Sequence, residues 1–166
     1  MQKTRRLTTA AIFTAVMFIL GYLESLLPAF FGIPGIKPGF ANIPVLTALF
    51  ILDFKLAAAM SVTRVILSGL TFSGMSACIY SLAGAVLSLT VMGLLKKTGR
   101  FSAIGLSIAG GVFHNFGQIL VAYFVVGPAV ISYFPVLVVS GMLAGTVTGL
   151  IAGILVRHLP KSVTGL

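Results

Sequence analysis

The chain has 166 residues, of which 58% are hydrophobic and 8% are charged. Soluble domains carry about 25% charged residues, so the composition excludes an ordinary soluble protein and implies that most of the surface faces lipid. At about 20 residues for each spanning helix, six spans use about 120 residues and leave fewer than about 50 for tails and loops. We therefore expect residues 1–166 to form a single membrane domain without a soluble appendage.

The formal net charge of +9 comes from 11 Lys and Arg residues against 2 acidic residues. Nucleic-acid binding requires basic residues gathered on a solvated face, whereas these residues separate hydrophobic runs, so no nucleic-acid partner is expected. The basic residues at 3–6 precede an apolar run without a clear cleavage site, which favours a retained first helix over a cleaved signal peptide. One cysteine and two histidines make an internal disulfide impossible and a tetrahedral metal site unexpected.

Hydropathy and Pro/Gly breakers predict an all-α integral membrane protein with six transmembrane helices. The predicted ranges are 7–27, 41–52, 56–70, 75–95, 102–126 and 136–159. The second and third are short, which leaves a tilted or partly re-entrant path open. Nine of the eleven basic residues fall on one side of this topology, so the positive-inside rule places both termini in the cytoplasm. The expected location is the cytoplasmic membrane, as a multi-pass protein.

Two predicted helices carry small residues every four positions, a pattern that allows close approach of another helix. In the last helix these residues are Gly141, Gly145, Gly149 and Gly153. We interpret that stripe as helix packing, with a role in conformational change as the alternative. In the first helix, Ala11 and Ala15 form a similar face near the cytoplasmic end. This face either packs inside the protein or docks a partner membrane subunit.

Polar residues inside the predicted spans recur at helical spacing, and an intramembrane charge usually faces a cavity or a partner. The third span carries Ala57, Ser61, Arg64 and Ser68, and the fifth carries Ser107, Gly111, His114 and Gln118, with Asn115 adjacent. At 1.5 Å per residue the charged and amide residues of both helices lie from the middle of the membrane to its outer half. We therefore predict a substrate-binding pocket beneath the first external loop. Its candidate residues are Glu24, Lys37, Asn42, Arg64, His114, Asn115 and Gln118.

Two simpler interpretations of these residues stay open. Arg64 could form a buried ion pair with Glu24 that only holds two helices together, and His114 could be an interior histidine whose hydrogen bonds are satisfied. A pocket is favoured because a structural pair alone does not require His, Asn and Gln at the same level. One acidic residue against one or two cations predicts an anionic or carboxylate-bearing ligand.

The chemistry available to the chain argues against an enzyme. The sequence lacks the G-x-x-x-x-G-K-[ST] loop that cradles phosphates, so it cannot hydrolyse ATP by itself. The two acidic residues, Glu24 and Asp53, are predicted on opposite sides of the membrane. That separation excludes paired-carboxylate catalysis and a carboxylate cage for Mg²⁺. We expect no catalytic residue, no metal site and no cofactor in this chain.

Three segments carry a resemblance to a known family: residues 38–44, Arg64, and the block from Gly110 to Gln118 that contains His-Asn-x-Gly-Gln. They resemble the Gx transporter family, also called heptaprenyl diphosphate synthase component I. That family is similar to the S components of energy-coupling factor (ECF) transporters. The resemblance implies a six-helix bundle, a ligand site near the outer face under the loop after the first helix, and an A-x-x-x-A dock matched by Ala11 and Ala15. It also implies a transmembrane coupling subunit and two ATPase subunits as partners.

These observations lead us to expect an S component that captures a small anionic vitamin or cofactor precursor. Arg64 would neutralise the ligand, while His114, Asn115 and Gln118 would supply hydrogen bonds and residues 34–42 would form a gate. The alternative is a non-catalytic membrane accessory of polyprenyl diphosphate or quinone metabolism that holds a lipid-like diphosphate for a soluble synthase. Catalysis by this chain conflicts with its single aspartate, because prenyl synthases bind Mg²⁺-diphosphate through aspartate-rich motifs. An autonomous channel or carrier is disfavoured because no inverted repeat is recognisable.

Overall fold

A computed structural model describes residues 2–27 and 38–159 of the chain. Its elements in chain order are α1 (Gln2–Leu26), the 3₁₀ turn η2 (Phe40–Asn42), α2 (Ile43–Ile51), α3 (Phe54–Ser68), the π-helical turn η3 (Gly69–Ser73), α4 (Met75–Lys97), α5 (Ala103–Val126), the 3₁₀ turn η4 (Pro128–Tyr133) and α6 (Phe134–His158). The described residues contain no β-strand. The all-α prediction is confirmed for this part of the chain, and five of the six predicted helices agree with the structure to within two residues at each end. The exception is α1, which begins five residues before the predicted start because its basic N-terminal turn continues the helix beyond the apolar run.

Five helical segments of the described chain are long and apolar enough to cross a membrane. The remaining predicted span, α2, has nine residues, or about 14 Å of helix at 1.5 Å per residue. A hydrocarbon core is about 30 Å thick, so α2 is too short to cross it alone, and the described residues support five of the six predicted transmembrane helices. Eight of its nine residues are buried, because the neighbouring helices surround it. Such a short, uniformly apolar helix serves as a core element.

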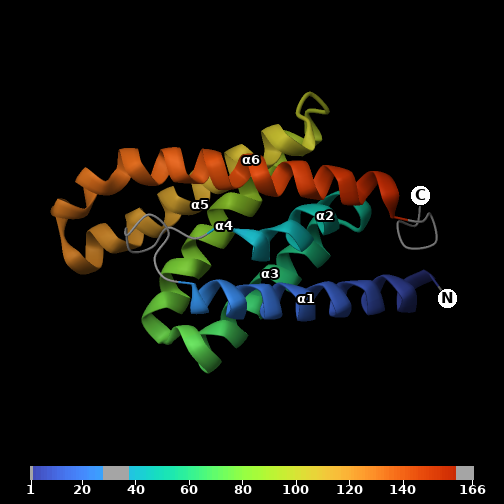
Figure 1. Cartoon of the computed structure of the whole chain (residues 1–166), viewed down its shortest axis with the longest axis horizontal. Coiled ribbons are helices and arrows are strands. Elements are labelled where there is room, and N and C mark those ends of the chain that lie inside the picture. The colour runs from blue at the N-terminus through green and yellow to red at the C-terminus, as the bar shows by residue number, and fades with distance from the viewer. Residues whose placement is uncertain (1, 28–37, 160–166) are drawn as a thin grey trace.

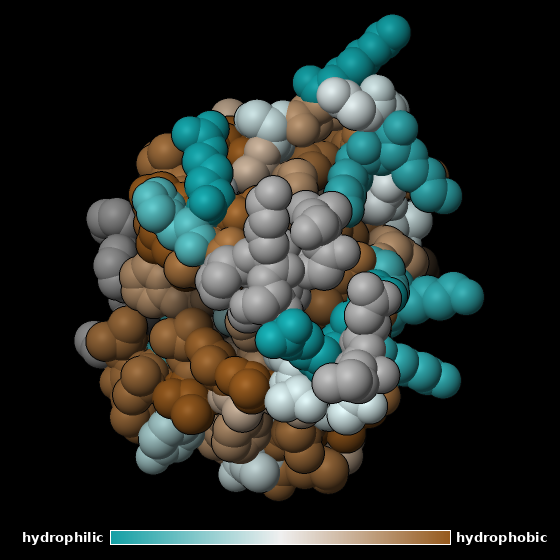
Figure 2. All heavy atoms as spheres, turned by 90° about the vertical axis from the view of Figure 1, so that its right-hand side faces the viewer, coloured by the Kyte–Doolittle hydropathy of each residue, from teal (hydrophilic) through white to brown (hydrophobic). Residues whose placement is uncertain are grey.

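The C-terminal end of α2 lies beside the start of α1 and the end of α4. Arg6 Nη2, near the start of α1, lies 2.6 Å from Asp53 Oδ2 at the start of α3. The Lys96 ammonium at the end of α4 donates to the carbonyl oxygen of Leu49, near the end of α2. Figure 1 shows the start of α1, the end of α2 and the end of α6 at the same end of the molecule. Figure 2 views that end and shows hydrophilic side chains projecting around it.

Local sequence explains where several helices begin and change direction. Asp53 and Ser102 are N-cap residues, and each side chain accepts a backbone N–H of the first turn of α3 or α5. Gly74, with φ of 81°, joins η3 to α4, and Gly127, with φ of 104°, separates α5 from η4. Both conformations are costly for residues with a Cβ. The polar caps and glycines therefore set the breaks that hydropathy alone leaves vague.

The last two long helices pack with their backbones almost touching. A Cβ added at Gly111 of α5 would lie 2.4 Å from the carbonyl oxygen of Gly141 on α6, and one added at Gly145 would lie 2.6 Å from the carbonyl oxygen of Ser107. Such contact requires glycine on the facing surfaces. The predicted packing role of the α6 glycine stripe is confirmed at Gly141, Gly145 and Gly149. Close packing at this interface positions the polar residues of α5 against α6.

Candidate functional site

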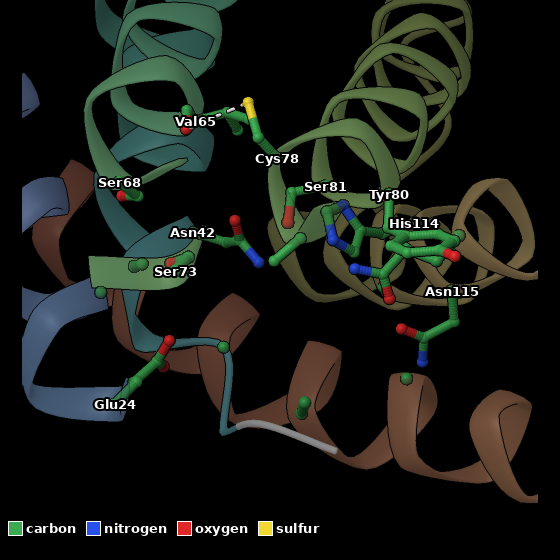
Figure 3. Close-up of a pocket in the computed structure, with 18 of the residues that line it drawn as sticks. Glu24, Asn42, Val65, Ser68, Ser73, Cys78, Tyr80, Ser81, His114 and Asn115 are labelled. Atoms are coloured by element: carbon green, nitrogen blue, oxygen red, sulfur yellow. Dashed lines mark hydrogen bonds between the residues drawn. The ribbon is translucent and has the colours of Figure 1, made fainter. Parts of the chain in front are cut away.

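A cavity of about 440 Å³ lies among α1, α3, η3, α4, α5 and α6, with η2 at its edge, and polar side chains interrupt its mainly apolar wall. This volume falls in the range of small-molecule sites, about 300–1,000 Å³. Six of the seven predicted pocket residues line it: Glu24, Asn42, Arg64, His114, Asn115 and Gln118. The seventh, Lys37, and the gate residues 34–37 lie outside the described residues. The structure thus brings these six residues together from four elements. Figure 3 labels Glu24, Asn42, His114 and Asn115 around the cavity.

Two side chains of α3, Arg64 and Ser68, line the cavity with a hydrogen-bond donor that has no partner among the described residues. Arg64 Nη2 lies 3.4 Å from Asn42 Oδ1, a long and weak hydrogen bond. Arg64 Nε and Ser68 Oγ are buried and have no hydrogen-bond partner among the described residues. Ser68 is only 5% exposed. Both donors are therefore withdrawn from solvent on the wall of a cavity.

Glu24 holds the chain at the edge of the cavity. Its carboxylate accepts the backbone N–H of Phe40, the first residue of η2, and its charge attracts the Arg64 guanidinium. Glu24 is 7% exposed, so this interaction takes place in a largely dry environment. The carboxylate thus links the end of α1 to the start of the η2–α2 segment while it lines the cavity.

Two of the α5 residues that line the cavity, His114 and Asn115, also contact the neighbouring helices. The His114 ring hydrogen-bonds the backbone of Gly84 on α4, and a Cβ at that glycine would lie 2.9 Å from ring Cε1. Asn115 Nδ2 donates to the Leu137 carbonyl oxygen at 2.6 Å and lies 3.4 Å from Ser140 Oγ. His114 and Asn115 therefore help to tie α5 to its neighbours. The interpretation of His114 as a satisfied interior histidine gains support from this packing.

The cavity also contains residues that sequence reasoning missed. They are Ser73 from η3, Cys78, Tyr80 and Ser81 from α4, and Ser140 from α6. The prediction assigned no functional residue to the α4 span. The available signal was the pair Ser81 and Ser88, which are seven residues apart and therefore share a helix face. Figure 3 shows that α4 contributes to the cavity from the side opposite Glu24.

A smaller recess of about 50 Å³ adjoins the cavity and shares Asn42, Gly111 and His114 with it. Four buried hydroxyl residues from four helices line the recess: Ser61, Ser88, Ser107 and Thr148. Thr148 Oγ1 lies 3.4 Å from the Gly39 carbonyl oxygen, which connects α6 to the start of η2. A polar space of this size suits about one or two water molecules. The polar interior thus extends beyond the main cavity toward the end of the bundle that carries Asp53.

Ala11 and Ala15 lie away from the cavity, on the exposed face of α1. The buried face of the same helix carries Ala10 at 7% exposure and Met17 at 0%. The packing alternative for Ala11 and Ala15 is therefore wrong within this chain, because their face contacts none of its helices closely enough to be buried. Their docking role stays a prediction.

Within residues 2–27 and 38–159, no group of three or more His, Cys, Asp or Glu side chains could hold a metal ion. The polar side chains of the described residues that line the cavity provide one guanidinium, one carboxylate, one imidazole, one thiol, amides and hydroxyls. This set can bind and orient a polar organic molecule. It offers a positive charge and hydrogen-bond donors on the α3 side, and amide groups on the α5 side.

Comparison with known proteins identifies the family but not the activity. No curated protein matches the chain, and no solved structure matches it. The model of one family, described as heptaprenyl diphosphate synthase component I, matches residues 13–155. Because this match covers most of the sequence and most of the described helices, the chain belongs to the heptaprenyl diphosphate synthase component I family.

Proposed function

We propose that this protein is the substrate-binding S component of an ECF-type transporter that takes up a small anionic vitamin or cofactor precursor. The cavity of about 440 Å³ between the helices carries this proposal. A cavity with a largely apolar wall and a few convergent polar groups is typical of small-molecule binding. A lipid-facing bundle of ordinary packing has no need for one.

The residues of the cavity have complementary roles in this proposal. Arg64 neutralises the negative group of the ligand, since an intramembrane cation needs a partner and its contact with Asn42 is long. Gln118 has no described hydrogen bond of its own and supplies its amide to the ligand. His114 and Asn115, already bonded to Gly84 and to α6, present their remaining ring and amide atoms from a rigid wall. A site held by packed helices in this way is preorganised, which favours affinity.

The exposed alanine face of α1 supports an interaction with a second membrane protein. Ala11 and Ala15 leave a shallow surface where another helix can approach closely. In the proposed complex this face docks the transmembrane coupling subunit, and two ATPase subunits drive the cycle. The hydrophilic end of the bundle (Figure 2) is then cytoplasmic, in line with the positive-inside rule, and the ligand enters from the opposite side.

One finding favours a second candidate. The family description names a component of heptaprenyl diphosphate synthase, which suits a non-catalytic membrane accessory that presents a prenyl diphosphate to a soluble partner component. This candidate requires the cavity to admit a long apolar chain beside Arg64. It predicts a complex with a prenyl synthase in place of a coupling subunit.

The test is mass spectrometry of small molecules that co-purify with the solubilised protein, combined with identification of the proteins that purify with it. Wild type is compared with Arg64→Ala and Gln118→Ala, and with Thr63→Ala, an exposed residue on α3, as the matched control. We expect a water-soluble anionic compound in wild type and Thr63→Ala that is lost in both cavity variants. Recovery of a prenyl lipid, or of a synthase as the main partner, would support the second candidate. Retention of the compound by both cavity variants would contradict the site.

Docking is tested separately with Ala15→Leu, because a larger side chain on the alanine face should keep the coupling subunit from close approach. The control is Val16→Leu, an exposed position on the next face of α1. We expect Ala15→Leu to lower recovery of the coupling subunit while Val16→Leu leaves it unchanged. Equal recovery with both variants would remove this face from the proposed interface.

A further inference from the structure

The two unpartnered donors on α3 share one face of that helix. Arg64 and Ser68 are four residues apart, so their side chains are neighbours one turn from each other. Arg64 Nε and Ser68 Oγ are both buried, both line the same cavity, and neither has a hydrogen-bond partner among the described residues. A buried donor without an acceptor is strongly disfavoured, and each such group in a native structure calls for an explanation.

An anionic oxygen group explains both donors at once. A guanidinium presents its N–H groups in a planar fork that matches the geometry of a carboxylate, and hydrogen bonds of this kind are among the strongest in proteins. The Ser68 hydroxyl can donate to the same group from the next turn. We propose that Arg64 Nε and Ser68 Oγ together form a subsite for one carboxylate group of the ligand. This inference rests on the proposed ligand-binding role of the cavity, but it does not depend on transport.

The charges around the subsite favour a carboxylate over a diphosphate. Among the described residues that line the cavity, Arg64 is the one Lys or Arg and Glu24 the one carboxylate. Because Glu24 already carries one negative charge beside Arg64, a bound carboxylate leaves one negative charge in excess among these groups. A diphosphate leaves an excess of at least two negative charges, so its burial costs more than that of a carboxylate. The proposal therefore assigns a monocarboxylate, or the carboxylate end of a larger molecule, to this part of the cavity.

The single cysteine of the chain provides a reporter at the subsite. Cys78 lines the cavity and is half-buried. Its Sγ lies 3.7 Å from the Val65 carbonyl oxygen, and 2.9 Å from the position of a Cβ added at Gly69. Val65 and Gly69 directly follow Arg64 and Ser68 in the sequence, so the thiol packs against the turn of α3 that joins them (Figure 3). A ligand on the subsite should shield this thiol from a small alkylating reagent.

The experiment measures the rate at which N-ethylmaleimide alkylates Cys78 in the full-length purified protein, at constant ionic strength. Benzoate, neutral benzamide of nearly the same shape, and inorganic diphosphate are the probes. We expect benzoate to slow alkylation of wild type in a saturable way, benzamide to have little effect, and diphosphate to protect less than benzoate. Ser68→Ala should raise the benzoate concentration for half-protection about tenfold, the expected loss of one hydrogen bond to a charged group. Arg64→Gln should abolish protection, and Thr63→Ala should behave as wild type.

Three results would overturn the proposal: no protection by benzoate, equal protection by benzamide, or an unchanged half-protection concentration in Ser68→Ala. Stronger protection by diphosphate than by benzoate would overturn the assignment to a carboxylate. Size-exclusion profiles of the variants show whether Arg64→Gln remains folded, and Ser68→Ala provides a second test if it does not. Uptake assays separate this proposal from transport. If benzoate protects Cys78 but no reconstituted complex shows uptake, the subsite stands and the transporter function is refuted. If uptake survives both Arg64→Gln and Ser68→Ala, the transporter function stands and the subsite is refuted.

Discussion

The contact between α5 and α6 permits a quantitative prediction from two glycines on the same face of α6. Gly145 and Gly153 are eight residues apart and belong to the same four-residue repeat. A Cβ at Gly145 would lie 2.6 Å from the Ser107 carbonyl oxygen and 2.8 Å from Ile108 Cα. A Cβ at Gly153 would meet the Ala103 Cβ at 3.6 Å, an ordinary van der Waals distance. The substitution Gly→Ala therefore tests overpacking at Gly145 and ordinary van der Waals contact at Gly153.

The expected effects follow from two opposing terms. Alanine in place of glycine inside a helix stabilises by about 0.5–1 kcal/mol. Overpacking of a filled interface costs about 1–3 kcal/mol, and the contacts of Gly145 are backbone atoms that cannot rotate away, which favours the upper part of that range. Gly145→Ala should therefore destabilise the protein by about 2 kcal/mol net, while Gly153→Ala should be neutral or stabilise it by up to about 1 kcal/mol.

The assay is thermal denaturation of both variants and wild type in the same detergent. The measured quantity is the fraction of protein that remains monodisperse at each temperature. For chains of this size about 1 kcal/mol corresponds to about 2–4 °C in midpoint, so Gly145→Ala should melt about 4–8 °C below wild type. Gly153→Ala should melt at or slightly above it. Equal midpoints for the two variants would refute the reasoning, because they would mean that α5 and α6 are not in backbone contact at Gly145.

Three further predictions concern the ends of the helices and the charge in the cavity. Asp53→Ala should lower the free energy of unfolding by about 1 kcal/mol because Asp53 caps α3. Arg6→Ala should lower it by less than about 0.5 kcal/mol because the Arg6–Asp53 ion pair is exposed. Melting midpoints compare the two variants, and equal losses would contradict the capping role. Lys96→Met should lower the melting midpoint by a few degrees, because it removes the donor to the Leu49 carbonyl oxygen near the end of α2. An unchanged melting midpoint would show that this hydrogen bond does not contribute to stability. Glu24→Gln should strengthen benzoate protection of the cysteine, because it removes a negative charge near the subsite. Weaker protection would contradict that charge argument.

The sequence by itself determined the helices and the level of the polar residues. Apolar runs bounded by Gly, Pro and capping residues are local signals, so α4 and α5 could be placed closely. Helical spacing and the constant rise per residue put Arg64, His114 and Gln118 between the middle of the membrane and its outer half, and the structure brings all three to one cavity. These inferences succeed because a membrane helix is regular, so sequence distance converts directly into height.

Tertiary structure decided which apolar surface meets protein and which meets lipid. Hydropathy cannot separate these environments, because both are apolar. For this reason α2 looked like a spanning helix, although its neighbours enclose it as a short core helix. For the same reason Ala10 and Ala11 could not be told apart, although one is buried and the other exposed. The unpartnered Ser68 hydroxyl depends likewise on which groups on other helices come within reach, and only the packed bundle specifies that.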